Sequence, residues 1–197
     1  MSYFLGNLTT VMPREQRLPT EHLKWLSAAL ARGELALLGP RPAFPDGHYI
    51  IRARDQADAE RIAAEDPATI AGYTRCEVVE WDIRRGGVPP LPPEGRTYFI
   101  CNLTTVVPRE QRERTAHLEW LEAAHARGEL ALSGPRPRYA DGHYLINATT
   151  PEEAERIASQ DPNNALGYTR PALVEWRIRL GQIPPVRAED AARQANT

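Results

Sequence analysis

Two histidines are the residues of this 197-residue chain that are best suited to proton transfer. His22 and His117 each stand near the start of a segment in which apolar residues recur at helical spacing. An imidazole has an unperturbed pKa of roughly 6.5, so it can take up and return a proton near neutral pH. A carboxylate beside the ring would orient it and fix its tautomer. The alternative is a packed helix histidine that donates to a backbone carbonyl.

Arginines and tyrosines supply the candidate groups for holding a substrate. A guanidinium beside a proline-rich loop could bind a carboxylate or phenolate as a fork, and a tyrosine could stack on a ring or donate a hydrogen bond. Ordinary surface positions for the arginines and core packing for the tyrosines are the alternatives. The predicted substrate-binding residues are Arg14, Arg41, Tyr73, Arg109, Arg136 and Tyr168. His48 and His143 follow Asp–Gly turns and are expected to face solvent.

Several other kinds of site and partner are disfavoured. The histidines form no metal triad, and neither Gly-rich phosphate motif nor Gly-x-Ser-x-Gly occurs, so we expect no metal and no cofactor. A net charge of −2 argues against nucleic acid. No apolar run suits a membrane span, and the start lacks a signal-peptide pattern, so a cytoplasmic address is expected. Cys76 and Cys101 are expected to be inert packing residues.

The chain contains an internal repeat. Positions 3–90 align without a gap on positions 98–185, and 55 of these 88 positions are identical. Two copies of a small domain follow, rather than a solenoid of short repeats. We predict repeat 1 at 1–86, a Pro/Gly-rich linker at 87–95, repeat 2 at 96–185, and a disordered tail at 186–197.

Each copy alternates strand and helix signals. We predict strands at 3–10, 34–38, 48–53 and 75–84, and helices at 21–31 and 56–65. Thr20 is the expected N-cap of the first helix, and Gly39-Pro40 is expected to stop the second strand. The order β-α-β-β-α-β is the ferredoxin-like motif, an α+β fold with both helices on one sheet face. The second copy is the economical partner for the other face, giving an intrachain pseudo-dimeric barrel. A further homodimer is left open.

The sequence resembles the YCII-related family, which is similar in fold to the dimeric α+β barrels. The residues that carry the resemblance are Thr20–Leu26, Gly33–Pro40, Ala59–Ala63, Asp66-Pro67 and Gly72, with their counterparts in the second copy. The resemblance implies a catalytic His–Asp dyad, mapped onto His22 with Asp66 and onto His117 with Asp161. On their own, these aspartates are typical of Asp-Pro turns. The segment 41–46 is shorter than in many members, so the pocket wall is expected to differ.

The family includes a protein similar to a dehydrochlorinase that acts on a hydroxylated aromatic ring without a cofactor. The resemblance therefore implies a cofactor-independent isomerase, lyase or cyclase acting on an oxygenated cyclic or aromatic metabolite, in keeping with secondary metabolism. One alternative is a non-catalytic metabolite-binding or accessory protein. Another is a cofactor-free monooxygenase of the same barrel type. In each case the expected partner is a small molecule, with neither nucleic acid nor membrane involved.

Overall fold

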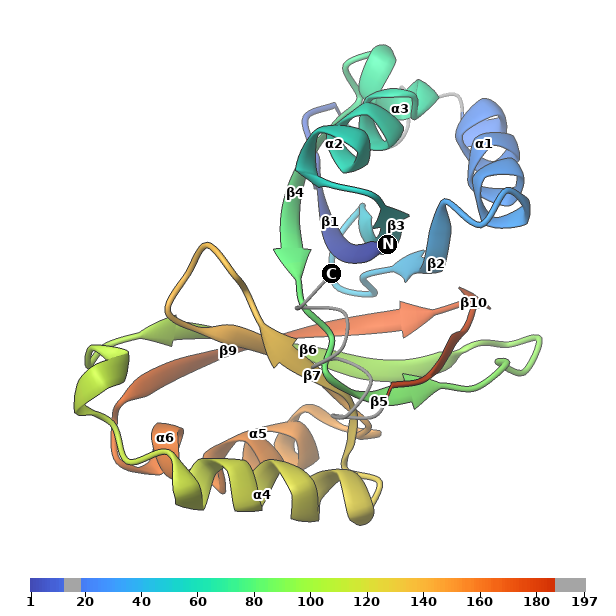
Figure 1. Cartoon of the computed structure of the whole chain (residues 1–197). Coiled ribbons are helices and arrows are strands. Elements are labelled where there is room, and N and C mark those ends of the chain that lie inside the picture. The colour runs from blue at the N-terminus through green and yellow to red at the C-terminus, as the bar shows by residue number, and fades with distance from the viewer. Residues whose placement is uncertain (13–18, 187–197) are drawn as a thin grey trace. The chain divides into compact units, whose positions relative to one another are not determined.

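The computed structural model describes residues 1–12 and 19–186, and both repeats contain the six predicted elements in the predicted order, with an additional short helix before the last strand (Figure 1). The first repeat contains β1 (Ser2–Thr10), α1 (Pro19–Ala31), β2 (Leu35–Pro40), β3 (Gly47–Ala53), α2 (Gln56–Ala64), α3 (Pro67–Ile70) and β4 (Thr74–Trp81). The second contains β6 (Arg96–Thr105), η2 (Arg109–Gln111), α4 (Thr115–Ala126), β7 (Leu130–Pro135), β8 (Gly142–Ile146), α5 (Pro151–Ser159), α6 (Pro162–Ala165) and β9 (Thr169–Ile178). The strands β5 (Arg85–Val88), β10 (Leu180–Gly181) and β11 (Ile183–Val186) were not predicted.

The chain forms two compact units, and neither is a single repeat alone. Unit 1 combines Met1–Trp81 with Pro90–Arg96 and Trp176–Ile183. Unit 2 combines Thr97–Glu175 with Asp82–Pro89 and the described residues from Pro184 onward. Each unit thus includes residues from the C-terminal end of the other predicted repeat.

Both sheets have the ferredoxin-like strand order, extended at one edge by such a segment. The order is β10-β2-β3-β1-β4 in unit 1 and β11-β5-β7-β8-β6-β9 in unit 2. β10 pairs antiparallel with β2, and β5 pairs antiparallel with β7. Gly134 on β7 makes this approach possible, because a Cβ there would lie 1.9 Å from the carbonyl oxygen of Asp82. The added strands cover what would otherwise be exposed sheet edges.

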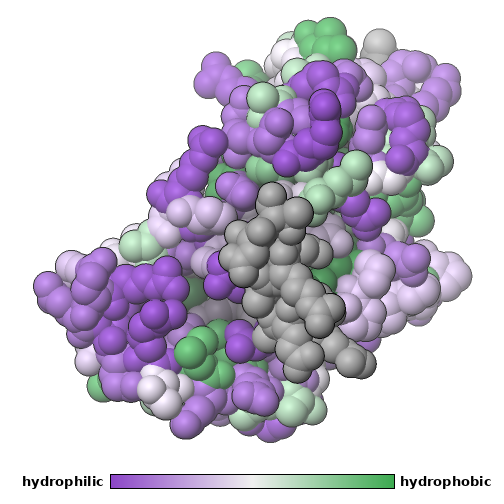
Figure 2. Space-filling view, in the orientation of Figure 1, coloured by the Kyte–Doolittle hydropathy of each residue, from purple (hydrophilic) through white to green (hydrophobic). Residues whose placement is uncertain are grey.

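The helices of each unit lie on one face of its sheet, as predicted, and the core fills the space between them (Figure 1). In unit 1 this core includes Phe4, Leu35 and Ile62, and in unit 2 it includes Phe99, Leu130 and Ile157. Burial of such apolar side chains is the main favourable term in folding. The visible surface is mostly hydrophilic, with apolar residues in separate spots (Figure 2). Within the described residues, no helix is long and apolar enough to cross a membrane.

Several local predictions need correction. Thr20 is not the N-cap of its helix, because α1 already begins at Pro19; proline suits a first helical position, where its missing N–H costs nothing. The second strand ends at Pro40, within the predicted Gly39-Pro40 stop, although it passes through Gly39 in register with His48 on β3. His48 and His143 are 4% and 2% exposed, so the expectation that they face solvent is wrong.

The predicted segment boundaries meet the observed strands in two places. The expected linker 87–95 overlaps β5, and the expected tail 186–197 begins at the last residue of β11. Residues 187–197 lie outside the described part of the chain.

Candidate active site

The C-terminal unit brings His117 and Asp161 together as a hydrogen-bonded pair. His117 lies in the first turn of α4, and Asp161 is the N-cap of α6. Nδ1 of His117 is 2.8 Å from Oδ1 of Asp161. The Asp161 side chain is fully buried, whereas that of His117 is 19% exposed. One end of the pair is therefore sealed in protein, and the imidazole end is accessible.

Local capping fixes the carboxylate of each dyad. Oδ1 of Asp161 accepts a hydrogen bond from the backbone N–H of Asn163 at 3.0 Å, which satisfies a donor at the start of α6. The N-terminal unit repeats the arrangement: Oδ1 of Asp66 accepts from the backbone N–H of Ala68 at 2.9 Å and lies 2.7 Å from Nδ1 of His22. The aspartates therefore have both roles considered from the sequence, as turn residues and as partners of the histidines.

A tyrosine distinguishes the two dyads. The hydroxyl of Tyr144 donates to Oδ2 of Asp161 at 2.6 Å. Burial, and then the charge of Asp161, raises the pKa of Tyr144 well above its usual value, so the phenol stays protonated and donates. The equivalent Tyr49 donates instead to Sγ of Cys76 at 3.2 Å. Among the described residues, Oδ2 of Asp66 consequently has no hydrogen-bond partner.

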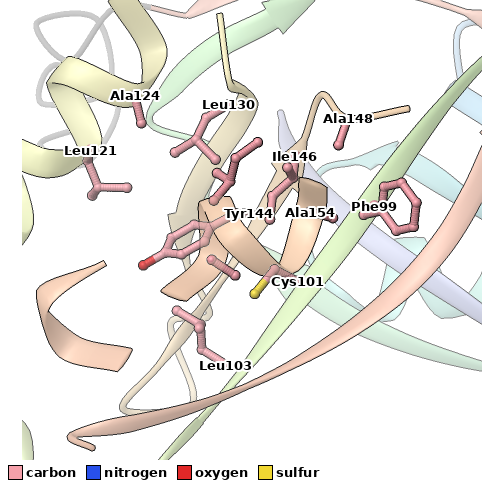
Figure 3. Packing of buried hydrophobic residues seen from close by; sticks show 12 residues of the cluster. Phe99, Cys101, Leu103, Leu121, Ala124, Leu130, Tyr144, Ile146, Ala148 and Ala154 are labelled. Atoms are coloured by element: carbon pink, nitrogen blue, oxygen red, sulfur yellow. The ribbon is translucent and has the colours of Figure 1, made fainter. Parts of the chain in front are cut away.

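Two sequence differences accompany this difference: Pro171 stands where Cys76 offers its thiol in the first repeat, and β6 has a cysteine where β1 has a glycine. A Cβ placed on Gly6 would lie 2.3 Å from Cε2 of Tyr49, so the tyrosine ring occupies space that only glycine leaves free. The second repeat has Cys101 at this position, and its side chain fills that space. Figure 3 shows the Tyr144 ring with its hydroxyl directed away from the Cys101 sulfur. The cysteine therefore favours the tyrosine position that reaches Asp161.

The geometry sets the protonation pattern of the dyad. A carboxylate only accepts hydrogen bonds, so Nδ1 of His117 carries the proton that is shared with Asp161. In the neutral ring, the lone pair is then on Nε2. The same holds for His22 with Asp66. Each histidine therefore has a lone pair at Nε2 that is able to accept a proton, beside an aspartate that holds the ring in place.

A cavity of about 140 Å³ opens beside His117, and all of its lining residues belong to unit 2. α4, the β7–β8 region and the segment 84–85 all contribute to its wall. Its ionisable and polar lining residues are Arg84, Arg85, Arg109, Arg112, Arg114, His117, Ser133, Asp141, Tyr144, Asn163 and Thr169. Ligand pockets usually measure roughly 300–1,000 Å³, so this cavity suits a small molecule or one end of a larger one.

The structure separates the predicted arginines into two groups. Arg109 lines the cavity, whereas Arg14 lies outside the described residues. Nε of Arg41 donates to Asp46 at 2.7 Å, and Nε of Arg136 donates to Asp141 at 2.6 Å. Both of these guanidiniums brace the loop between the second and third strands of their repeat, so they are not available as free forks.

The predicted tyrosines do not lie in this cavity. Tyr73 and Tyr168 are half-buried after Gly72 and Gly167, which have positive φ, and neither contributes to the lining. Their carbonyl oxygens accept from the backbone N–H groups of residues 11–12 and 106–107. Tyr144, which the sequence indicates as a possible hydrogen-bond donor but more readily as a core residue, lines the cavity and donates to Asp161. Sequence reasoning missed the paired His125 Nε2 and Ser133 Oγ, which are 2.8 Å apart.

The two cysteines are free thiols, and neither is activated. Burial raises the pKa of Cys76 to about 11 and that of Cys101 to about 12, so both stay protonated at neutral pH. Within residues 1–12 and 19–186, no group of three or more His, Cys, Asp and Glu side chains is arranged to hold a metal ion.

Comparison with known proteins places this geometry in a family. The YCII-related domain model matches twice, over residues 4–82 and 98–177. The uncharacterized protein YjpA of Bacillus subtilis (strain 168) is 31% identical over 83 residues, which is 42% of this chain and 98% of YjpA. That relative therefore corresponds in length to a single repeat.

Two solved structures share the fold over nearly the whole chain. A proposed monooxygenase from Lactobacillus acidophilus NCFM has a TM-score of 0.54 at 11% identity and covers 95% of this chain and 98% of its own. A proposed monooxygenase from Fusobacterium nucleatum subsp. nucleatum ATCC 25586 has a TM-score of 0.58 at 12% identity, with coverage of 93% and 94%. The predicted α+β fold class, with two ferredoxin-like repeats, is confirmed. The chain belongs to the YCII-related domain family, with one copy of the domain in each half.

Proposed function

We propose that the chain is a cofactor-independent enzyme that moves a proton on a small oxygenated cyclic or aromatic metabolite. The observation that carries the proposal is the His117–Asp161 pair, because the buried carboxylate fixes Nδ1 while His117 lines a cavity. This arrangement leaves Nε2 as the base beside a bound molecule. Proton transfer by a positioned side chain contributes roughly 10²–10⁴-fold to a rate.

The same dyad supports an isomerase, a lyase or a cyclase. Nε2 removes a proton from the substrate and holds it as the imidazolium. Returning that proton to another atom completes an isomerisation. In an elimination, the electrons of the broken C–H bond form a double bond, and the leaving group departs with its own electron pair. Asp161 and Tyr144 stabilise the imidazolium intermediate without themselves reacting.

Two variants of the dyad test the proposal and separate its catalytic role from its capping role. Asn also caps helices well, so Asp161→Asn keeps the cap of α6 and removes the negative charge beside His117. His117→Ala removes the base. A screen of hydroxylated aromatics and lactones by thermal shift finds binders, because a ligand of the folded state raises the melting temperature.

A binder that wild type converts should be bound but not converted by His117→Ala, and converted at least about a hundredfold more slowly by Asp161→Asn. His22→Ala is the matched variant in unit 1, and assaying both histidine variants shows whether one or both sites turn over. Equal turnover by wild type and by His22→Ala/His117→Ala would contradict the proposal. Binding without conversion by any of these proteins would favour a metabolite-binding or accessory protein.

A cofactor-free monooxygenase is the second candidate, favoured by the two proposed monooxygenases that share the fold. A base at Nε2 could deprotonate a phenol and so make the ring more reactive toward oxygen. Turnover under nitrogen separates the two proposals, since proton transfer proceeds without oxygen and monooxygenation stops.

A further inference from the structure

The residues that line the cavity of unit 2 are more polar than the residues at the equivalent positions of the other copy. Four lining residues are polar or charged where the equivalent positions of the other copy are apolar: Arg85 for Leu180, Arg114 for Pro19, Ser133 for Leu38, and Asn163 for Ala68. These replacements are far apart in sequence and meet at one cavity. The cavity is therefore more polar than the equivalent positions of the other copy, as suits a polar ligand.

The cavity wall carries an excess of positive charge. Within the described part of the chain, Arg85, Arg109 and Arg114 form no ion pair with a carboxylate. The only carboxylate among the described lining residues is Asp141, and Arg136 already neutralises it. Guanidinium groups that line one cavity without a counter-charge favour a carboxylate or phosphate, which they bind as forks.

The wall also carries a buried polar atom that lacks a partner. Asn163 is 7% exposed, and its side-chain oxygen has no hydrogen-bond partner among the described residues. A buried polar group left unpaired costs about 1–3 kcal/mol. A ligand hydroxyl would satisfy it in either orientation of the amide, because a hydroxyl both donates and accepts.

Ser133 adds a second fixed polar group to the same wall. It is 1% exposed, and its Oγ lies 2.8 Å from Nε2 of His125 on α4. Burial, and then the charge of Arg85, lowers the pKa of His125 to about 4, so the imidazole is neutral at physiological pH. The His125–Ser133 pair is therefore polar but uncharged, and the positive charge of the cavity wall comes from the arginines.

We propose that the cavity of unit 2 binds a small hydroxylated carboxylate, with its anionic group held by Arg85, Arg109 and Arg114 and its hydroxyl bonded to Asn163. This inference rests on the proposed function, since His117 lines the same cavity, and it names the substrate class of that site. Phosphate has the same fork-binding chemistry, so the experiment includes a phosphate arm.

Isothermal titration calorimetry of the full chain tests the ligand class with matched probes. Salicylate carries the acid and the hydroxyl, salicylamide lacks the charge, benzoate lacks the hydroxyl, and phenyl phosphate replaces the carboxylate. We expect salicylate to bind about tenfold or more tightly than either salicylamide or benzoate, as befits charge-assisted bonds. Tighter binding of salicylamide, or of phenyl phosphate alone, would overturn the carboxylate assignment.

Two substitutions test which side chain binds which group of the ligand. Arg85→Leu and Asn163→Ala each introduce the residue found at the equivalent position, so the fold should tolerate them. Arg85→Leu should weaken salicylate about tenfold and leave salicylamide unchanged, whereas Asn163→Ala should remove the preference for salicylate over benzoate. Arg156→Gln is the control for net charge, because Arg156 lies on α5 outside the cavity lining. An equal loss in Arg156→Gln and Arg85→Leu would show a general charge effect and refute the site.

Failure of this inference is distinguishable from failure of the proposed function. His117→Ala should still bind salicylate with little change, because the arginines hold the anion. If His117-dependent turnover is found on uncharged substrates that Arg85→Leu still accepts, the anion site is wrong and the proton-transfer proposal stands. If salicylate binding depends on the arginines and no turnover depends on His117, the anion site stands and the proton-transfer proposal is wrong.

Discussion

Removal of one hydroxyl from each repeat should affect the two units unequally. Tyr144→Phe and Tyr49→Phe are chemically the same change at equivalent positions, and both rings are buried, at 3% and 1% exposure. Each ring also packs against a tryptophan of its own unit, with centroids 5.6 Å apart for Trp120 and 6.0 Å apart for Trp25. Packing is therefore conserved in both variants, and only the hydrogen bond is lost.

The expected magnitudes follow from the acceptors. Tyr144 donates at 2.6 Å to Asp161, which is fully buried, and a hydrogen bond to a charged group contributes roughly 1.5–3 kcal/mol. Tyr49 donates at 3.2 Å to the thiol of Cys76, and sulfur is a weak acceptor, so its loss should cost about 0.5 kcal/mol. Tyr144→Phe should therefore lower the free energy of unfolding by about 1–2.5 kcal/mol more than Tyr49→Phe.

Urea denaturation of the full chain measures this difference, with fluorescence and circular dichroism as separate probes. Two units can unfold in separate steps, so coincidence of the two probes must be checked before a single free energy is assigned. Equal destabilisation by the two variants would refute the reasoning, because the hydroxyls would then have equivalent partners. A larger effect for Tyr49→Phe would also refute it.

Three further changes test other parts of the structure. Gly6→Ala should destabilise the chain by about 1–3 kcal/mol, measured by thermal melting, because the new methyl group meets a buried tyrosine ring. Arg136→Ala should lower the melting temperature, since it leaves Asp141, at 7% side-chain exposure, without its cation; a loss of ligand affinity at unchanged stability would contradict this bracing role. His125→Leu/Ser133→Leu should make the chain less sensitive to acid. The pKa of His125 in the folded chain is about 4, below its unfolded value of about 6.5. The neutral imidazole therefore contributes stability above pH 6.5, and this stability is lost as the pH falls from 6.5 to about 4. Urea midpoints at pH 7 and pH 4.5 measure that loss, and an unchanged difference between wild type and the double variant would exclude His125 as its source.

Local pattern was sufficient to predict the fold of each repeat. The strand and helix signals between residues 3 and 84 fall on β1 to β4 within a few residues at each boundary, because periodic apolar burial determines both the signal and the structure. The pairing of His22 with Asp66 required the family resemblance as well. Residues 44 positions apart are brought to 2.7 Å by the packing of α1 against α3, which no local pattern encodes.

The added edge strands could not be predicted, because their residues also suit a linker. Gly86 directly precedes the expected linker at 87–95, yet it has φ of +90° in β5, and a Cβ there would lie 1.9 Å from the carbonyl oxygen of Ala131. A glycine required by close backbone approach has the same sequence signature as a glycine in a flexible linker. Burial of His48 was missed for a similar reason, since an Asp–Gly turn indicates where the chain reverses and not which face the next side chain occupies.

The differences between the two copies are more informative about function than their identities. A duplicated domain keeps its ancestral residues for some time whether or not both sites work, so two intact His–Asp pairs do not show two active sites. Replacements that are scattered in sequence but meet at one cavity have no such explanation. In unit 2, Cys101 stands at the position equivalent to Gly6 and Tyr144 reaches Asp161, while Arg85, Arg114 and Asn163 stand on the cavity wall where the equivalent positions are apolar. A purely structural domain would gain nothing from unpaired guanidiniums, and its buried unsatisfied amide would cost stability. That cost is physically reasonable if a ligand offsets it, and for this reason we expect unit 2 to hold the substrate.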